Sequence, residues 1–234
     1  MELDKWLIEQ KELKTKLIYD DTFNKESLDY VGGVDISFIK GDTINACAAY
    51  VVMSYPDLKV VYEDYQMVKL TGPYIPGFLA FREVEHLVKL VNKCPVDCKV
   101  IFVDGNGILH PNGFGLASHL GVLLNKPTVG VGKKLFLIDG FDKQVIKDKV
   151  SNECKKKGDY VKLIGDSGIC HGVALVPDNL VTNPIYVSIG HMISLDTAIK
   201  IVNDISIYRI PEPVRLADIR SRKFIRELPE IKLI

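Results

Sequence analysis

An aspartate directly follows a short apolar run near the middle of the chain. The run Val100–Val103 has the length and β-branched content of a buried strand, and Asp104 then opens a glycine-rich loop. In open α/β sheets, ligands bind beyond the carboxyl ends of the strands, where such a loop lies. A carboxylate buried there is costly unless a cation or a hydrogen-bond donor meets it. Asp104 is therefore predicted to be a functional acid.

Two further acids lie in elements that should reach the same region. Asp35 interrupts the apolar sequence Gly32–Phe38, and Glu83 lies early in the amphipathic segment Phe78–Asn92. Carboxylates from separate elements offer the hard oxygen ligands that Mg²⁺ or Mn²⁺ prefers. A cation held in this way activates water and neutralises the charge that develops on a phosphodiester. The pattern predicts metal-assisted phosphodiester hydrolysis.

Both acids also have a simpler structural interpretation. Asp35 could occupy an edge position and face water, although an acid with apolar neighbours on both sides is rare there. Glu83 could be a surface acid that interacts favourably with the amino-terminal dipole of its helix. These alternatives differ in whether the two side chains meet Asp104.

Two glycine-rich segments resemble phosphate-binding loops but lack residues that such loops need. Gly105–His110 is one residue short of a dinucleotide fingerprint, and Asp104 would repel a pyrophosphate bound there. Gly130–Lys134 follows Pro127, which stands where a phosphate loop needs its first glycine. A nucleotide cofactor is therefore disfavoured.

The elements that position the acids follow a mixed order. A first amphipathic helix is expected at Glu2–Leu17, and three strands then form an antiparallel meander. Further strands and helices alternate after the helix that carries Glu83. The expected strands are Tyr30–Ile39, Ile44–Ser54, Lys59–Met67, Val100–Val103, Pro127–Val131, Tyr160–Ile164, Ile169–Val176 and Ile185–Ser188, and the later helices are Leu116–Leu124, one within Lys143–Gly158, Leu195–Ile205 and one from Pro211 to about Ile225. This order predicts an α/β protein of the ribonuclease H-like fold with a central mixed sheet.

The composition of the chain further limits the kind of protein that it can be. The 234 residues, of which 47% are hydrophobic, indicate one catalytic domain over residues 1–234. Thirty basic and thirty acidic residues cancel, so nucleic-acid binding would need a local patch. Five cysteines, an odd number, favour reduced thiols and an intracellular site, and Cys94 and Cys98 lack a second pair for zinc. No signal-peptide core or membrane-spanning apolar run is expected.

The C-terminal run Arg209–Arg226 is the best candidate for such a patch. It holds six basic residues against Glu212 and Asp218, a local net charge of +4. The run could follow the phosphates of a nucleic acid, or it could be an ordinary solvated helix face.

Several long motifs together resemble the endonuclease V family. In order they are VGGVDISF, SYPDLKVVYED, PYIPGFLAFREVEHL, VDGNGILHPNGFGLASHLGVLLNKPTVGVGKKLF, SIGHMISLDTAI and RIPEPVRLADIRSR, from about Tyr30 to Arg222. The resemblance implies cleavage at the second phosphodiester bond 3′ to inosine with Mg²⁺, for which Mn²⁺ can substitute. The segments VGGVDISF and RIPEPVRLADIRSR, together with Asn106, are similar to the animal-type enzymes, which implies a preference for RNA.

The resemblance also implies a set of metal-binding acids. Asp35, Glu83 and Asp104 would bind the cation, and Asp218 would complete the site as a late acid. Asp218 has its own alternative, because Arg222 stands one helical turn later and a surface ion pair would satisfy it.

Two further catalytic residues are implied close to the scissile phosphate. They are Lys133 and His191, which follow two expected strands. Lys133 could instead be a solvated turn lysine, and His191 could be a capped core histidine. The family usually has alanine where Gly132 stands, a small change that leaves Lys133 in register.

The segment around Tyr74 matches the wedge of the family. Two prolines stiffen it, and the ring of Tyr74 could stack in the gap left by an extruded base. Its alternative is a rigid connection with a packed tyrosine. Inosine differs from adenine by O6 and a protonated N1, so recognition needs a donor and an acceptor. The residues expected to bind substrate are Tyr74, Ile75, Pro76, Gly77, Leu79, Gly107 and His110.

The sequence thus predicts a Mg²⁺-dependent endoribonuclease acting on inosine in single-stranded or loosely paired RNA. We expect a monomer without membrane contact, in the cytoplasm and also in the nucleus or nucleolus. One alternative is a deoxyinosine-specific DNA repair endonuclease. Another is a non-catalytic module that binds inosine strands, which would have little need for Asp35, Glu83, Asp104 and Lys133 together.

Overall fold

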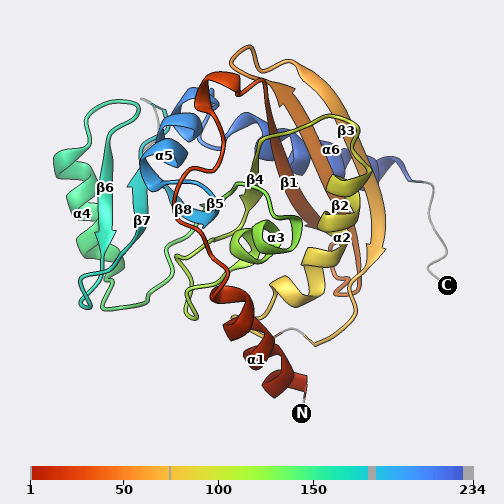
Figure 1. Cartoon of the computed structure of the whole chain (residues 1–234), viewed down its shortest axis with the longest axis horizontal. Helices are drawn as coiled ribbons and strands as arrows, with labels where there is room; N and C mark the ends of the chain where they lie inside the picture. Colours follow the sequence, from red (N-terminus) through yellow and green to blue (C-terminus); the bar gives the residue numbers. More distant parts are fainter. Residues whose placement is uncertain (1, 74, 179–182, 229–234) are drawn as a thin grey trace.

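The computed structural model describes residues 2–73, 75–178 and 183–228, and one mixed sheet of eight strands runs through its centre (Figure 1). The strand order is β3-β2-β1-β4-β5-β8-β7-β6. The strands β1 (Tyr30–Phe38), β2 (Asn45–Ser54) and β3 (Val60–Lys69) form the antiparallel meander, and β4 (Val100–Asp104) and β5 (Thr128–Gly132) run parallel to β1. The predicted ribonuclease H-like order is therefore confirmed.

The other end of the sheet is antiparallel. β8 (Ile185–His191) pairs antiparallel with β5, and β7 (Cys170–Leu175) and β6 (Tyr160–Ile164) form a hairpin beside it. Because β8 runs against β5, its last residues lie at the edge of the sheet opposite the carboxyl ends of β4 and β5. This direction decides where His191 lies.

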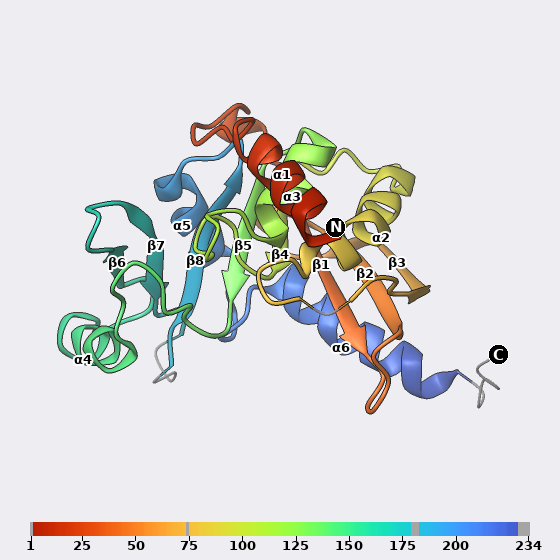
Figure 2. The ribbon, with the colours of Figure 1, turned by 90° about the horizontal axis from the view of Figure 1, so that it is seen from below.

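Helices cover both faces of the sheet (Figure 2). One apolar core joins the sheet to two later helices, and a second core joins its other face to two earlier helices, whose apolar residues recur at helical spacing. The later helices are α5 (Leu195–Asp204) and α6 (Glu212–Glu227), and the earlier ones are α2 (Ala80–Lys93) and α3 (Leu116–Leu124). The helix α1 (Glu2–Lys14) lies beside α3, a short 3₁₀ turn spans Lys25–Ser27, and α4 (Lys143–Glu153) packs on the β6–β7 hairpin.

A glycine lets α6 rest on β1. A Cβ on Gly33 would lie 2.2 Å from the carbonyl carbon of Pro213, so only glycine allows this close approach. Alternate residues of a strand share one face, and Asp35 and Ser37 therefore point to the same side as Gly33. This contact brings the side chains of α6 over the end of β1.

The structure bears on two expectations, the state of the cysteines and the length of the apolar helices. All five cysteines carry free thiols. In the part of the chain that the structure describes, no helix combines the length and the apolar character needed to cross a membrane.

Candidate active site

The register of the sheet places two aspartates side by side. Val34 of β1 pairs with Val103 of β4 in parallel, so Asp35 and Asp104 are neighbours at the carboxyl ends of adjacent strands. Asp35 is only 7% exposed. Burial, and then the negative charge of Asp104 close by, raises the pKa of Asp35 well above its ordinary value. The two carboxyl groups therefore repel each other unless a proton or a cation lies between them.

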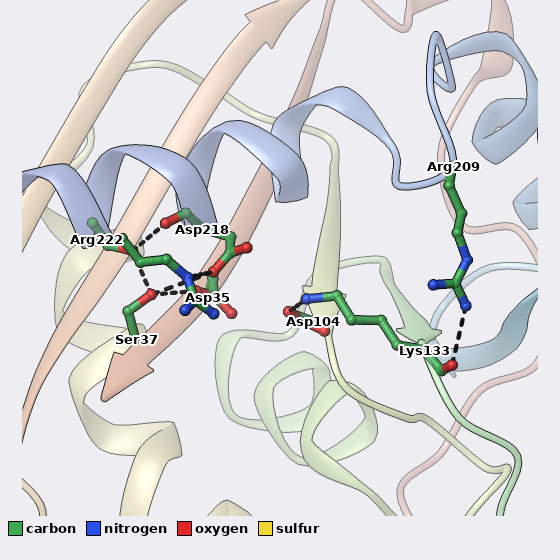
Figure 3. A network of polar contacts seen from close by, with 8 residues as sticks. Asp35, Ser37, Asp104, Lys133, Arg209, Asp218 and Arg222 are labelled. Carbon is green, nitrogen blue, oxygen red and sulfur yellow. Dashed lines mark hydrogen bonds and ion pairs between the residues drawn. The ribbon is translucent and has the colours of Figure 1, made fainter. Parts of the chain in front are cut away.

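Helix α6 adds a third acid to this pair (Figure 3). Ser37 Oγ lies 3.0 Å from Asp35 Oδ2 and 3.5 Å from Asp218 Oδ1, so the serine hydroxyl bridges β1 and α6. The guanidinium of Arg222 donates from Nε to Asp218 Oδ1 at 2.5 Å. The ion pair between Asp218 and Arg222 is thus present, and it occurs at the site rather than away from it.

The ammonium group of Lys133 balances part of the negative charge. Lys133 follows β5, and its Nζ lies 2.5 Å from Asp104 Oδ2 (Figure 3). Burial by itself lowers the pKa of Lys133, but the carboxylates of Asp104, Asp35 and Asp218 raise it above its ordinary value. Lys133 therefore remains charged and is not a solvated turn lysine.

Glu83 reaches the same region from the first turn of α2. Burial, followed by the charge of Asp104, raises the pKa of Glu83 to about 7, although the guanidinium of Arg82 opposes this shift. A carboxyl group with this pKa gains or loses a proton close to neutral pH. The interpretation of Glu83 as an exposed surface acid is wrong, because the side chain is half-buried and lines a cavity with Asp35 and Asp104.

That cavity, of about 360 Å³, opens at the carboxyl edge of the sheet. The acids and Lys133 form part of its wall, and Gly77, Leu79, His110 and Phe136 form another part. Ile75 and Pro76 stand just before this wall without lining it, and Tyr74 lies outside the described residues. The cavity thus combines a carboxylate cluster with apolar and aromatic surface of the kind that holds a base.

A family model described as Endonuclease V matches residues 11–219. The chain belongs to the endonuclease V family. Among curated relatives, Endonuclease V of Mus musculus is 47% identical over 96% of this chain and 70% of its own length. The protein is accordingly a nuclease, a hydrolase of phosphodiester bonds.

Solved structures of the family share the fold closely. The catalytic domain of human Endonuclease V superimposes with a TM-score of 0.93 at 46% identity, covering 96% of both chains. Endonuclease V of Ciona intestinalis, crystallised with a 24mer DNA containing an inosine followed by a ribo-adenosine, gives 0.91 at 37% identity, over 97% of this chain and 99% of that one. Argonaute of A. aeolicus shares the fold alone, at 18% identity and a TM-score of 0.50.

His191 does not join the acids of this endonuclease V site. It pairs with Thr128, the first residue of β5, whereas Asp104 pairs with Val131 near the end of that strand. His191 is 3% exposed, and its Nδ1 accepts a hydrogen bond from the backbone N–H of Ile18 at 3.3 Å. The prediction that His191 lies near the scissile phosphate is corrected, because β8 runs antiparallel to β5 and carries it to the opposite edge.

Gly107 is also displaced from its expected role. Its N–H donates to Ser188 Oγ at 2.9 Å, and its carbonyl accepts from the N–H of Gly115 at 2.9 Å. A Cβ on Gly107 would lie 1.9 Å from the carbonyl oxygen of Ile189, so this glycine is needed for packing against β8. The expectation that its backbone groups contact the base is therefore corrected. Gly105 and Asn106 line the cavity in its place.

Three residues of the site were missed by sequence reasoning. Ser37 bridges two acids, and Gln10 of α1 donates to the carbonyl groups of Gly77 and Phe114 at 3.2 and 3.0 Å. The third is Asn106, whose buried Oδ1 has no hydrogen-bond partner within the described residues. A Cβ on residue 132 would lie 2.6 Å from this atom. The glycine at position 132 therefore leaves room for the amide of Asn106.

The C-terminal basic run is not the continuous patch that was expected. Most of its cations are paired with acids and are therefore already neutralised. The pairs are Arg215 with Glu212, Arg220 with Glu63, Arg222 with Asp218, and Lys223 with Glu227. Arg209 differs, because it donates to the carbonyl oxygen of Lys133 at 3.2 Å (Figure 3).

The donor set at this edge fits a divalent cation. Endonuclease V nucleases are generally metal-dependent. Within residues 2–73, 75–178 and 183–228, no three His, Cys, Asp or Glu side chains converge tightly enough to enclose an ion by themselves. Mg²⁺ does not need such an enclosure, since it is usually held by one or two carboxylates together with waters and substrate phosphate. The repulsion between Asp35 and Asp104 would be relieved by such a cation.

Proposed function

We propose that this chain is a Mg²⁺-dependent endonuclease that cleaves inosine-containing strands at the second phosphodiester bond 3′ to the base, with RNA as its preferred substrate. The observation that carries the proposal is the position of Asp35 and Asp104 side by side on adjacent strands, with Lys133 beside them, in the wall of a cavity large enough for a base. Carboxylates forced together in this way are suited to a hard cation and a phosphate.

Each residue of the cluster has a distinct role in this proposal. Asp35 and Asp104 hold the cation, with Glu83 and Asp218 as further acids around it, and Mn²⁺ substitutes for Mg²⁺. When bound, the cation activates water and offsets the negative charge of the reacting phosphate. Lys133 presents its ammonium group to the same phosphate and stabilises the charge that develops there. Burial raises the pKa of Glu83 to about 7 in the metal-free protein, and a cation bound beside it would favour the ionised carboxylate.

The base is recognised in the other part of the cavity. His110 Nδ1 accepts a hydrogen bond from the N–H of Asn112 at 3.2 Å, and burial lowers the pKa of His110 to about 4. The ring is therefore neutral, with its proton on Nε2, which can donate to O6 of inosine. Backbone groups at Leu79, in the cavity wall, are the candidates for an acceptor of the N1 proton. Tyr74 would stack in the gap left by the extruded base.

The preference for RNA rests on the nucleotide that follows the inosine. The Ciona enzyme was crystallised on DNA in which a single ribo-adenosine follows the inosine. The 2′-hydroxyl of a nucleotide in that position adjoins the second phosphodiester bond, and such a hydroxyl distinguishes RNA from DNA. This supports an endoribonuclease. A deoxyinosine repair endonuclease remains the second candidate, because the same DNA complex shows that the fold binds deoxyribose strands.

A matched cleavage assay tests the proposal. Labelled strands of one sequence, carrying inosine in RNA, deoxyinosine in DNA, or deoxyinosine followed by one ribonucleotide, are incubated with Mg²⁺ at one salt concentration. We expect the RNA and the chimera to be cut faster than the DNA, at the second bond 3′ to inosine. Equal rates on RNA and DNA would favour the repair enzyme, and binding without cleavage in Mg²⁺ or Mn²⁺ would favour the non-catalytic module.

The proposal also covers where and in what form the enzyme acts. We expect a monomer in the cytoplasm, with the nucleus and nucleolus as further compartments. Sedimentation of the purified chain would contradict this if it gave a dimer, as would microscopy of the tagged protein if it placed the chain on membranes.

A further inference from the structure

A second cavity borders the segment that follows β5. Its volume is about 310 Å³, and its wall includes Lys133, Lys134, Lys143 and Arg209. Lys133 lines both this cavity and the one that holds the acids. The two cavities are therefore adjacent, and a chain leaving the acids past Lys133 would meet the second one.

Among the described residues, Arg209 has no acidic partner in this wall. Its Nε donates to the carbonyl oxygen of Asn183 at 3.2 Å, and its Nη2 donates to those of Pro184 at 3.1 Å and Lys133 at 3.2 Å. These carbonyl groups fix the plane of the guanidinium but carry no net charge. A half-buried cation held in this way gains free energy when an anion reaches it.

The surroundings leave the positive charge of the cavity uncompensated. No Asp or Glu occurs among the described residues that line it. Of the acids nearest in sequence, Asp139 accepts hydrogen bonds from Ser167 and contacts His171, and Asp142 caps α4 through the N–H groups of residues 144 and 145. The cavity therefore differs from α6, where most of the basic side chains are paired with acids.

We propose that this cavity binds a backbone phosphate of the substrate strand that lies beyond the cleaved linkage. The inference rests on the proposed function, since it assumes that the strand passes Lys133. Arg209 supplies fixed donors, and Lys134 and Lys143 are exposed ammonium groups that add long-range attraction. A contact of this kind positions the strand without reading its sequence.

Substitution of the two exposed lysines tests the proposal. Arg209 is left intact because it also holds the carbonyl group of Lys133. We expect Lys134→Ala combined with Lys143→Ala to raise KM about tenfold on a long inosine strand while kcat stays unchanged. The slope of log kcat/KM against log salt should become shallower by about 1. The matched control is Lys147→Ala combined with Lys149→Ala, on exposed positions of α4 outside the cavity wall.

Experiments with shortened strands and with inorganic phosphate distinguish the possible sources of the anion. Shortening the strand one nucleotide at a time from each end should, on one side of the inosine, abolish the difference between the double variant and the wild type. The proposal is overturned if the cavity variant and the α4 control change KM equally, or if the difference persists on the shortest cleavable strand. It is also overturned if inorganic phosphate binds tightly at the cavity while strands bind independently of both lysines.

A direct binding measurement distinguishes failure of the phosphate site from failure of the proposed function. Anisotropy of a labelled strand measures lysine-dependent affinity whether or not the strand is cut. Loss of affinity in the cavity variant alone would support the phosphate site even if inosine strands proved not to be substrates, and unchanged affinity would reject the site even if they were cleaved.

Discussion

Two aspartates of this molecule occupy opposite edges of the sheet, and their pKa values shift in opposite directions. Asp21 lies near the end of β8, where its carboxylate accepts hydrogen bonds from Ser194 and Thr197 and pairs with Lys25. These partners outweigh burial and lower the pKa of Asp21. Asp35 faces Asp104 instead, and burial together with that charge raises its pKa.

The difference separates a structural carboxylate from a functional one. Asp21 is surrounded by donors that fit its charge, so ionisation stabilises the fold. Asp35 and Asp104 lack enough donors of their own, so their ionised pair destabilises the protein until a cation binds. The endonuclease V fold thus concentrates its unfavourable electrostatics at the edge where a cation and a phosphate would supply the missing charges.

The largest effect is expected from the acids that face each other. Asp35→Asn or Asp104→Asn should lower kcat at least about 10³-fold, which corresponds to about 4 kcal/mol of transition-state stabilisation. Strand binding should be largely preserved. Asp35→Asn should also stabilise the metal-free protein increasingly as pH rises above the ordinary pKa of an aspartate, because it removes a carboxylate whose pKa is raised in the folded state. Cleavage kinetics and urea unfolding check both parts, and near-normal turnover would contradict the assignment.

The two edges can be compared directly through Lys133 and His191. Lys133→Met should reduce kcat about 10²-fold or more, because it removes a charge beside the reacting phosphate. His191→Gln should reduce it less than about threefold, because the imidazole lies at the far edge and bonds to the backbone of Ile18. Both variants are assayed on the same inosine strand in Mg²⁺. A loss of kcat for His191→Gln as large as that for Lys133→Met would restore a catalytic role to the histidine.

Asp21→Asn should affect stability rather than chemistry. The variant loses charge-assisted hydrogen bonds to Ser194 and Thr197, with an expected cost of about 2 kcal/mol at pH 7. Because the pKa of Asp21 is lowered in the folded state, this contribution is present above the unfolded pKa and disappears as pH falls through the folded one. Unfolding free energies at several pH values measure the effect, with kcat of the folded variant as the control. A difference from wild type that persists at pH 2 would contradict this account.

The smallest expected effect is a pH dependence of the unfolding free energy that comes from His119 of α3. The ring is 2% exposed between Phe81 and Phe114, and burial lowers its pKa to about 4. The unfolded chain takes up a proton below about pH 6.5, whereas folded His119 does so only near its lowered pKa. Wild type should therefore lose about 1 to 2 kcal/mol relative to His119→Phe between pH 6.5 and 4.5. Parallel unfolding curves for the two proteins over this range would show that His119 titrates normally.

The sequence predicted the elements well where hydrophobic periodicity was strong. The strands of the meander, the helix that carries Glu83 and the run before Asp104 lie within one or two residues of their expected bounds, whereas α1 ends at Lys14, three residues early. The strand predicted as Ile185–Ser188 continues to His191, because the pattern could not show that β5 would pair along this length. Periodicity reports which face of an element is buried, but it does not give the partner or the direction of that element.

Asp35, Glu83 and Asp104 could be predicted as acids in apolar surroundings, and motif resemblance then connected them with Asp218 and Lys133. The composition and order of residues also determined the fold class, since strand and helix patterns act over a few residues. Whether these side chains meet was decided only by tertiary structure. The parallel pairing of β1 with β4, the contact of α6 with Gly33 and the antiparallel direction of β8 bring Asp218 to the site and keep His191 away. These are long-range pairings, fixed when separate apolar faces pack together, and local sequence carries little information about them.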